Sequence, residues 1–494
     1  MQIVTYLNQK SYNLSKNISK LVLPIREVFV SLNWRYWIEY QIIVNINSLI
    51  KTKFTMNNTP IPYDIVKAKI EESKLSKVGK ASIREVVSLV NKIEATSGQK
   101  FIRMEMGVPG IEPAEIGINA EIEALKRGVA SKYPMIDGVP ELKKEISRFV
   151  KNFMNIDVEE KCCIPTVGSM QGGMASFLLT NRCNAQKDTV LFIDPGFPVQ
   201  KQQLRVLGMN YETFDVYNYR GEKLREKLES YLKKGNISTI LYSNPNNPSW
   251  ICFTDNELKI IGELATAYDV IVIEDLAYFA MDFRKDLSKP GVPPYQPTVA
   301  NFTKNWLLLI SSSKAFSYAG QRIGCLVISN DLYSRRFPDL KRFFSSDEFG
   351  YAMIYGAVYS LSSGVCHSVQ YGLAAMLKAA NDGTFNFVEA VREYGEKAKT
   401  MKKLFTDNGF KIVYDMDEDK PLADGFYFTI SYPGFTGEDL IEELLYYGVS
   451  AISLAITGSE RTEGLRACVS QVSKNQFTDL EFRLKKFNEN HPIK

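Results

Sequence analysis

The chain has 494 residues, with 60 basic and 56 acidic side chains, a formal net charge of +4, and 45% hydrophobic residues. This length exceeds one compact core and fits about two to four domains. The composition is that of an ordinary globular protein and excludes collagen-like, disordered and membrane-embedded chains. Because the charge is near balance and no long Lys/Arg run is present, nucleic acid is not an expected partner.

The scarcity of histidine and the scatter of cysteine narrow the chemistry further. His367 and His491 are the only histidines, which excludes multi-histidine zinc sites and argues against Ser/His/Asp hydrolysis. The seven cysteines are an odd number and contain no C-x-x-C pair. This pattern is typical of buried free thiols in a reducing compartment. We therefore expect a cytoplasmic protein without a metal site.

Residues 1–55 differ from the rest, because basic residues outnumber the two acids, Glu27 and Glu39. Arg26, Arg35 and Glu39 interrupt the best apolar stretch, so we expect no transmembrane helix. No apolar region with a small-residue cleavage site follows the basic head, as a signal peptide would require. Three interpretations stay open: a poorly ordered extension, a transit-like segment, or translated sequence upstream of a true start at Met56. The first and the last are favoured.

From residue 56 onward the pattern predicts an α/β protein. Short apolar runs at 189–193, 238–242, 270–273 and 306–310 do not alternate with polar residues, as in strands that are covered on both faces. Thr254 and Glu257 form a capping-box pattern before a helical run, which predicts a βαβ unit between the second and third strands. Amphipathic helices are predicted at 140–152 and 387–405.

Polar or aromatic residues follow each predicted strand. Phe197 follows the first, Asn247 the second, Asp275 and Tyr278 the third, and the serine run before Lys314 the fourth. In open parallel sheets, ligands bind beyond the carboxyl ends of the strands. We therefore expect one pocket to collect these residues.

The residue types in this pocket point to an aldehyde that also carries a phosphate. Lys314 supplies an amine, and Arg322, eight residues later, supplies an anion clamp. Asp275 would be costly at the end of a buried strand unless a cation pairs with it, and a protonated pyridine nitrogen would be such a cation. The glycine-rich stretch 167–173 would present backbone N–H groups to the phosphate, and Phe197 could stack on a flat ring.

These motifs, in this order and spacing, resemble the fold-type I pyridoxal-phosphate (PLP) enzymes of the class I/II aminotransferases. The resemblance covers nearly all of residues 60–485. It implies an α/β fold like that of aspartate aminotransferase, in which a large PLP domain with a mainly parallel seven-stranded sheet spans residues 117–382. It also implies a smaller α+β domain that combines residues 56–116 with 383–494.

The resemblance further implies roles for individual residues. Catalysis would fall to Lys314, which would bind the cofactor aldehyde covalently, with Asp275 and Tyr278 in support. The implied cofactor ligands are Ser169, Met170 through its backbone, Phe197, Asn247, Asp275, Tyr278, Ser311, Ser313, Lys314, Arg322 and, across a dimer interface, Tyr133. The implied substrate contacts are Gly107, Asn247 and Arg466.

Three departures from the family pattern stand out. Ser249 and Trp250 replace the usual Thr-Gly after Asn247-Pro248, and we expect the indole either to reshape the entrance or to contact the substrate. Met170 stands where a polar residue is common. No second arginine of the dicarboxylate-specific kind can be placed, so aspartate specificity is not predicted.

The predicted function is amino transfer between an α-amino acid and a 2-oxo acid by a ping-pong mechanism, in a homodimer whose partners include neither nucleic acid nor membrane. One alternative is β-elimination or decarboxylation on the same scaffold, because the cofactor residues would be identical. The other is a PLP-binding regulator with an N-terminal DNA-binding segment. Residues 1–95 lack a helix-turn-helix pattern, which disfavours the regulator.

Overall fold

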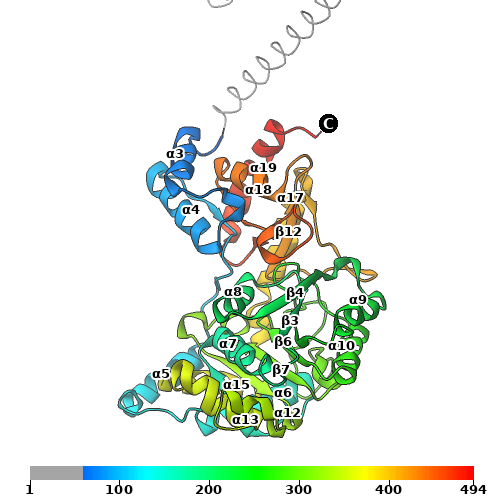
Figure 1. The fold of residues 1–494 in the computed structure, drawn as a ribbon. Coiled ribbons are helices and arrows are strands. Elements are labelled where there is room, and N and C mark those ends of the chain that lie inside the picture. The colour runs from blue at the N-terminus through cyan, green and yellow to red at the C-terminus, as the bar shows by residue number, and fades with distance from the viewer. Residues whose placement is uncertain (1–58, 494) are drawn as a thin grey trace, which may run out of the picture. The chain divides into compact units, whose positions relative to one another are not determined.

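The computed structural model describes residues 59–493, so the predictions for residues 1–55 and for a start at Met56 lie outside the described part. A seven-stranded sheet forms the centre of the α/β part (Figure 1). Its strands are β2 (Cys163–Thr166), β3 (Thr189–Asp194), β4 (Asn210–Asp215), β5 (Ile237–Ser243), β6 (Ile271–Leu276), β7 (Trp306–Ser311) and β8 (Gly324–Ile328).

The order of strands across the sheet is β2-β8-β7-β6-β5-β3-β4. Strand β8 runs antiparallel to both of its neighbours, and the other adjacent pairs are parallel. The predicted, mainly parallel seven-stranded sheet is therefore confirmed, and β6 occupies its middle.

The four apolar runs predicted as strands form β3, β5, β6 and β7, with ends that differ by a few residues. Helix α10 (Asp255–Ala267) begins with the predicted capping box: the Glu257 N–H donates to Thr254 Oγ1, and the Thr254 N–H donates to Glu257 Oε2. Because β5 and β6 are adjacent and parallel, β5, α10 and β6 form the predicted βαβ unit.

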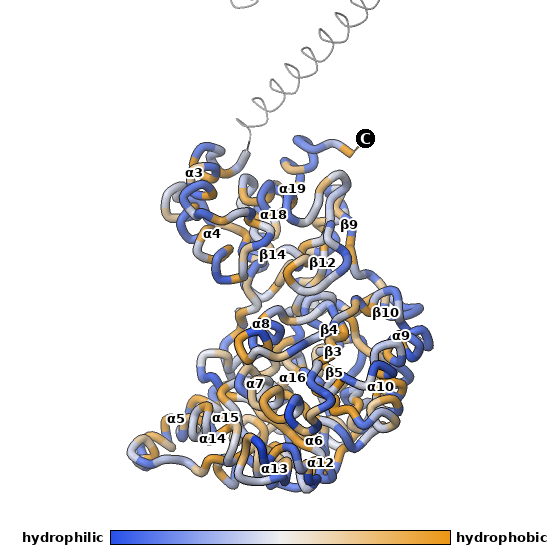
Figure 2. Tube along the Cα trace, in the orientation of Figure 1, coloured by the Kyte–Doolittle hydropathy of each residue, from blue (hydrophilic) through white to orange (hydrophobic). Residues whose placement is uncertain are grey.

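Apolar side chains project from both faces of the sheet. On β3, Leu191 and Ile193 belong to one core cluster, whereas Val190 and Phe192 belong to another on the opposite face. Helices cover both faces (Figure 1), and Figure 2 shows that an outer helix such as α9 (Lys223–Leu232) is largely hydrophilic. This double burial explains why the strand sequences are apolar without alternation.

The other helices of this part are short to medium in length. They are α5 (Glu115–Lys126), α6 (Pro140–Met154), α7 (Gly168–Thr180), α8 (Pro198–Leu207), α11 (Ser312–Ala315), α12 (Asn330–Ser334), α13 (Phe349–Tyr351), a π-helical turn (Ala352–Val358), α14 (Tyr359–Ser362) and α15 (His367–Asn381). The helix predicted at 140–152 is thus present as α6.

The single helix predicted at 387–405 is wrong, because two helices occupy this segment. They are α16 (Phe387–Ala390) and α17 (Glu393–Asp407), and Val391 between them leaves the helical conformation with φ −115°. Phe387 packs in the core beside the large sheet, whereas Phe405 packs in a second core. The helix is thus interrupted at the point where its apolar side chains pass from one core to the other.

The second core joins segments from the two ends of the described chain. Val86 and Leu444 belong to the same buried cluster. Its elements and those beside it are α3 (Tyr63–Ser73), α4 (Ile83–Ser97), β1 (Ile102–Arg103), β9 (Lys411–Ile412), β10 (Met416–Asp417), β11 (Lys420–Pro421), β12 (Tyr427–Ser431), α18 (Gly437–Tyr446), β13 (Val449–Ser450), β14 (Ile452–Ser453), β15 (Leu465–Cys468) and α19 (Phe477–Asn490). The domain boundaries at 116/117 and 382/383 stay predictions.

Two small sheets organise this second core. Strands β14, β15, β12 and β9 form a four-stranded antiparallel sheet in that order, and β1 pairs in parallel with β13. Within residues 59–493, no helix combines the length and apolarity needed to cross a bilayer.

Buried charges attach the β10–β11 hairpin to the loop between β5 and α10. The Arg220 guanidinium donates to both Glu257 carboxylate oxygens, at 2.7 and 2.8 Å, and also to Asp417 at 3.1 Å. The Cys252 N–H donates to the same Asp417 carboxylate at 3.0 Å. Each buried charge thus has a charged partner, which offsets the cost of its desolvation and fixes the loop that precedes α10.

Candidate active site

A cavity of about 510 Å³ lies at the carboxyl ends of β5, β6 and β7, where a parallel sheet is expected to bind ligands. Every predicted site residue except Tyr133 lines it: Gly107, Ser169, Met170, Phe197, Asn247, Asp275, Tyr278, Ser311, Ser313, Lys314, Arg322 and Arg466. Tyr133 lies outside, with 95% of its surface exposed. Its predicted reach toward a partner subunit stays a prediction.

Asp275 is buried near the carboxyl end of the central strand β6. Its carboxylate accepts hydrogen bonds from Gln200 Nε2 at 2.8 Å and from the Ala277 N–H at 3.1 Å. Among the described residues, no lysine or arginine forms an ion pair with it. Burial raises the pKa of Asp275 to about 6, although both hydrogen bonds lower it. The carboxylate therefore favours a cationic ligand at this point of the cavity.

Lys314 enters the cavity from α11, directly after β7. Its Nζ donates to the Gly107 carbonyl oxygen and has no carboxylate partner within the described residues. Burial, together with the positive charges of Arg466 and Arg322, lowers the pKa of Lys314 to about 8. About a tenth of this amine is therefore unprotonated at pH 7, and a nucleophile or general base must be in that form.

The start of α7, together with Arg322, forms a cradle for an anion. Ser169 and Met170 lie in the first turn of α7, where backbone N–H groups point out of the helix. The space is narrow, because a Cβ on Gly168 would lie 2.8 Å from Arg322 Nη2. Ser311 and Ser313 line the same cavity from the end of β7. The cradle thus has the donors and the charge that a phosphate needs.

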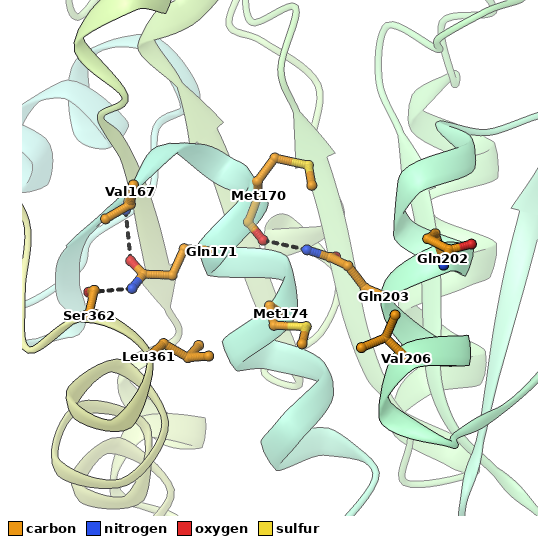
Figure 3. Close-up of a pocket in the computed structure, with 9 residues that line it drawn as sticks. All are labelled: Val167, Met170, Gln171, Met174, Gln202, Gln203, Val206, Leu361 and Ser362. Carbon is orange, nitrogen blue, oxygen red and sulfur yellow. Dashed lines mark hydrogen bonds between the residues drawn. The ribbon is translucent and has the colours of Figure 1, made fainter. Parts of the chain in front are cut away.

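A second cavity, of about 400 Å³, adjoins the first at Met170 (Figure 3). Met170 and Gln203 line both cavities, and Gln203 Nε2 donates to the Met170 carbonyl oxygen at 2.8 Å. Met174, Val206 and Leu361 make the second cavity mainly apolar (Figure 3). The methionine at position 170 therefore keeps its backbone in the cradle, held by Gln203.

Arg466 reaches the cavity from β15. Its Nη2 donates to the Glu105 carbonyl oxygen at 2.6 Å and its Nη1 donates to Asn247 Oδ1 at 3.2 Å. Its Nε has no partner among the described residues, and the side chain is almost completely buried. A buried guanidinium without a carboxylate partner attracts an anionic ligand group.

Two tyrosines complete the wall beside Arg466. The Tyr278 hydroxyl donates to the Tyr427 hydroxyl at 2.7 Å, and the Arg466 guanidinium lies 4.4 Å from the centre of the Tyr427 ring. Burial raises the pKa of Tyr427 to about 12 and that of Tyr278 well above its usual value. Both hydroxyls therefore stay protonated at neutral pH and can donate hydrogen bonds.

Three residues that line the cavity were not predicted from the sequence. Gln200 lies one helical turn beyond Phe197, so its place in the first turn of α8 is a signal that could have revealed it. Tyr427 in β12 and Arg84 in α4 also line the cavity. Local sequence gives no signal for these two, because they reach the site only through the folding of the second core.

The expected contact between Trp250 and the substrate is wrong, because the indole is 1% exposed and does not line the cavity. An effect of Trp250 on the shape of the entrance stays a prediction. It packs behind Tyr278 and Tyr427, whose ring centres lie 5.3 and 6.2 Å from its own. Burial of this size needs a matching space, which the glycine at position 425 provides.

Comparison with known proteins decides the family. The model of the family "Aminotransferase class I and II" matches residues 100–480. The chain belongs to the class I and II aminotransferases. A probable aspartate aminotransferase of Methanocaldococcus jannaschii is 26% identical over 352 residues, covering 67% of this chain and 88% of the relative. The glutamate-pyruvate aminotransferase AlaC of Escherichia coli is 28% identical over 247 residues, covering 48% and 56%.

Solved aminotransferase structures share the fold. A variant of Thermus thermophilus aspartate aminotransferase matches 83% of this chain and 97% of its own, with 18% identity and a TM-score of 0.65. Alanine aminotransferase from Pyrococcus furiosus matches 83% and 98%, with 19% identity and a TM-score of 0.66. The predicted fold and family are thereby confirmed, and the activity of this aminotransferase is PLP-dependent transamination.

The residues of the cavity fit PLP. The buried Asp275 carboxylate has no cationic partner among the described residues, and a protonated pyridine nitrogen would provide one. The unpaired Lys314 amine suits the aldehyde, and the cradle of α7 and Arg322 suits the phosphate. The charges and donors of this aminotransferase thus correspond to the three polar ends of the cofactor.

We expect the covalent uptake of PLP by the cofactor-free protein to depend on the protonation of Lys314. Only the unprotonated amine attacks an aldehyde, so the initial rate should rise about tenfold per pH unit below pH about 8 and level off above it. The visible absorbance of bound PLP measures this rate.

Two variants serve as comparison. Lys314→Ala should leave the PLP spectrum as that of the free aldehyde, whereas Lys304→Ala, a change at an exposed lysine that pairs with Asp331, should behave as wild type. A rate that stays flat between about pH 6 and pH 8 would contradict a nucleophile with this pKa.

Proposed function

We propose that the residues lining the cavity carry out transamination in the individual roles given below. We also propose that the substrates are dicarboxylic amino acids and 2-oxo acids. Two groups of the cavity carry the assignment, the Asp275 carboxylate on β6 and the Lys314 amine on α11, which follows the adjacent strand β7. Neither has an ion-pair partner among the described residues. A carboxylate for the ring nitrogen and an amine for the aldehyde are the two groups that PLP chemistry needs most.

Bound PLP withdraws electrons from the substrate Cα and so acidifies its C–H bond. The Asp275 carboxylate holds the proton on the ring nitrogen, which keeps that electron withdrawal strong. The Lys314 amine accepts the Cα proton as general base and later returns a proton as general acid. Its pKa of about 8 suits both tasks near neutral pH.

Binding groups orient the Cα–H bond toward that amine. Arg466 binds the substrate α-carboxylate through parallel hydrogen bonds, and Asn247, which already accepts a hydrogen bond from Arg466, keeps the guanidinium in place. Arg322, the serines at 169, 311 and 313, and the backbone of Met170 bind the phosphate. Tyr278 and Asn247 bind the phenolic oxygen, and Phe197 packs on the ring.

Arg84 supports the dicarboxylic substrate class. Five charged residues line the cavity, and Asp275 is the only acid among the described ones. Of the four cations, Lys314, Arg322 and Arg466 have roles above, which leaves Arg84. Its guanidinium contacts Met106 Sδ at 3.7 Å and forms no ion pair within the described residues. The Arg84 side chain is exposed, and a second substrate carboxylate would replace water on its guanidinium with a charge-assisted hydrogen bond.

The names of two relatives also favour this class. The Methanocaldococcus jannaschii protein is a probable aspartate aminotransferase, and a Pyrococcus horikoshii relative is an aspartate aminotransferase. We further propose a cytoplasmic location, supported by seven free cysteines, because free thiols are typical of reducing compartments.

A homodimer is the third part of the proposal. Tyr133 is 95% exposed, and large apolar side chains are exposed on α5 and around α13 and α14, where a second copy could cover them. These side chains are Ile116, Ile118, Ile122, Leu125, Met135, Tyr351, Tyr355 and Tyr359. Tyr133 would then reach the phosphate of the neighbouring subunit.

Asp275→Asn tests the chemistry. Without an acceptor, wild type mixed with a donor amino acid should release about one equivalent of 2-oxo acid per subunit, as a ping-pong half-reaction requires. Asp275→Asn should slow this release by about a hundredfold or more, because the neutral amide no longer holds the ring proton. Rapid-quench analysis of the oxo acid measures the rate.

Glu274→Gln is the matched control for this variant. Glu274 adjoins Asp275 but does not line the cavity, and burial raises the pKa of Glu274 to about 7, so glutamine removes about half a charge at pH 7 from a position outside the cavity. This variant should release the oxo acid at about the wild-type rate. Continuous release of pyruvate and ammonia, instead of one equivalent of oxo acid, would establish a lyase and overturn the proposal.

Arg84→Gln tests the substrate class. The variant should raise KM for aspartate and glutamate about tenfold or more and leave KM for alanine unchanged, because only the dicarboxylic substrates have a carboxylate for Arg84. Steady-state kinetics on the three donors measure the effect. Lys92→Gln, at an exposed position on the same helix, should change none of them. An equal change for all three donors would refute the role of Arg84.

Complementation between two inactive variants tests the dimer. If Tyr133 serves the neighbouring subunit, a hybrid of Tyr133→Ala and Lys314→Ala chains contains one complete site. Co-refolding equal amounts should then restore about a quarter of wild-type activity, since about half of the dimers are hybrids with one active site each. Absence of restored activity, although the hybrid is isolated with two affinity tags, would refute the shared site.

A further inference from the structure

Trp250 has a backbone conformation that few side chains adopt. Its φ is +68°, in the left-handed region that a residue with a bulky side chain rarely enters. The surrounding turn holds it there: the Trp250 N–H donates to the Asn246 carbonyl oxygen, and the Asn246 N–H donates to the Ile251 carbonyl oxygen. Ser249 Oγ also donates to Asn246 Oδ1 at 2.7 Å. This turn thus determines the direction in which the indole points.

The indole occupies a space that stays open only because residue 425 is a glycine. A Cβ on Gly425 would lie 2.0 Å from Trp250 Cε2. The indole Nε1 has no hydrogen-bond partner among the described residues, so packing and not polarity holds the ring. Gly425 lies two residues before Tyr427, at the start of β12. The packing of Trp250 against Gly425 therefore fixes the distance between the turn after β5 and β12, the strand that carries Tyr427.

The seated indole supports the two tyrosines from behind. Its ring makes edge contacts with Tyr278, at an interplanar angle of 67°, and with Tyr427, at 70°. Both tyrosines line the cavity, while the indole does not. The Tyr427 ring lies in turn under the Arg466 guanidinium. A series of contacts thus leads from Trp250 through Tyr427 to Arg466.

We propose that Trp250 is a positioning residue for this aminotransferase. It holds Tyr278 and Tyr427 so that their hydroxyls stay within hydrogen-bond distance of one another and present a polarised donor to the phenolic oxygen of PLP. Through its contact with Tyr427, Trp250 also fixes the position of the Arg466 guanidinium, which would bind the substrate α-carboxylate. Because a tyrosine hydroxyl has one proton, binding to the phenolic oxygen requires Tyr278 to turn its proton from Tyr427 to the cofactor, with the Tyr427 hydroxyl donating to the Tyr278 oxygen in its place. A donor that accepts a hydrogen bond from a second hydroxyl is a stronger donor. The inference rests on the proposed roles of Tyr278 and Arg466.

Trp250→Leu tests the proposal in the PLP-loaded enzyme. A hydrogen bond to the negatively charged phenolic oxygen favours its deprotonated form, so a weaker donor raises the pH at which bound PLP changes colour. The variant should shift this midpoint upward by about 0.5–1 pH unit and lower kcat/KM about tenfold. Trp250→Phe keeps an aromatic edge against both tyrosines and should restore most of the wild-type values.

Trp306→Leu is the matched control. Trp306 is a buried indole at the start of β7, outside the cavity, so its loss weakens the core without touching the tyrosines. It should lower the melting temperature and leave the colour midpoint unchanged. An unchanged midpoint in Trp250→Leu, or an equal shift in Trp306→Leu, would overturn the role of Trp250.

A structural readout separates this inference from the proposed function. Crystal structures of wild type and Trp250→Leu, both without cofactor, should show the Tyr278–Tyr427 hydroxyl distance of 2.7 Å only in wild type. If that distance persists in the variant, Trp250 does not position the pair, and the inference fails while the roles of Lys314 and Asp275 stand. If wild type gives no band with PLP but the distance changes, the proposed function fails and the positioning of the pair holds.

Discussion

The site depends on one buried negative charge, the carboxylate of Asp275 at the end of the central strand of the sheet. Moving a carboxylate out of water is expensive, and here two hydrogen bonds compensate for the loss only in part, so that burial still raises the pKa to about 6. The strand must be central and covered on both faces to create this burial. The sheet that excludes water from the Asp275 carboxylate therefore also makes this carboxylate a selective partner for a cationic ring.

The cations around Lys314 have two effects that reinforce each other. Arg466 and Arg322 attract anionic ligand groups, and their charges also lower the pKa of the Lys314 amine, which burial has already lowered. When a carboxylate and a phosphate neutralise these arginines, their repulsion of a protonated Lys314 falls. The amine thus becomes a stronger base once the ligands are in place, when proton abstraction is needed.

The sequence was informative wherever a residue's place follows from its own strand. Asp275 and Lys314 could be predicted because each follows an apolar run, and parallel strands bring their carboxyl ends together. Tyr427 and Arg84 could not, because they reach the cavity through the packing of α4 and β12 in the second core. The break between α16 and α17 was not predicted for the same reason. The sequence shows that this segment has apolar residues at helical spacing, but it does not show which of the two cores they pack against.

The unfavourable backbone conformation of Trp250 is compensated by packing against a residue elsewhere in the chain. A glycine at φ +68° costs nothing, whereas a tryptophan there costs about 1 kcal/mol or more in backbone strain. A buried indole is worth roughly 3 kcal/mol or more relative to a small side chain, so the exchange is favourable only if the ring is fully seated. Gly425 provides that seat, because even one methyl group there would collide with the indole. The tryptophan at position 250 therefore depends on the glycine at position 425, and the two positions form a coupled pair.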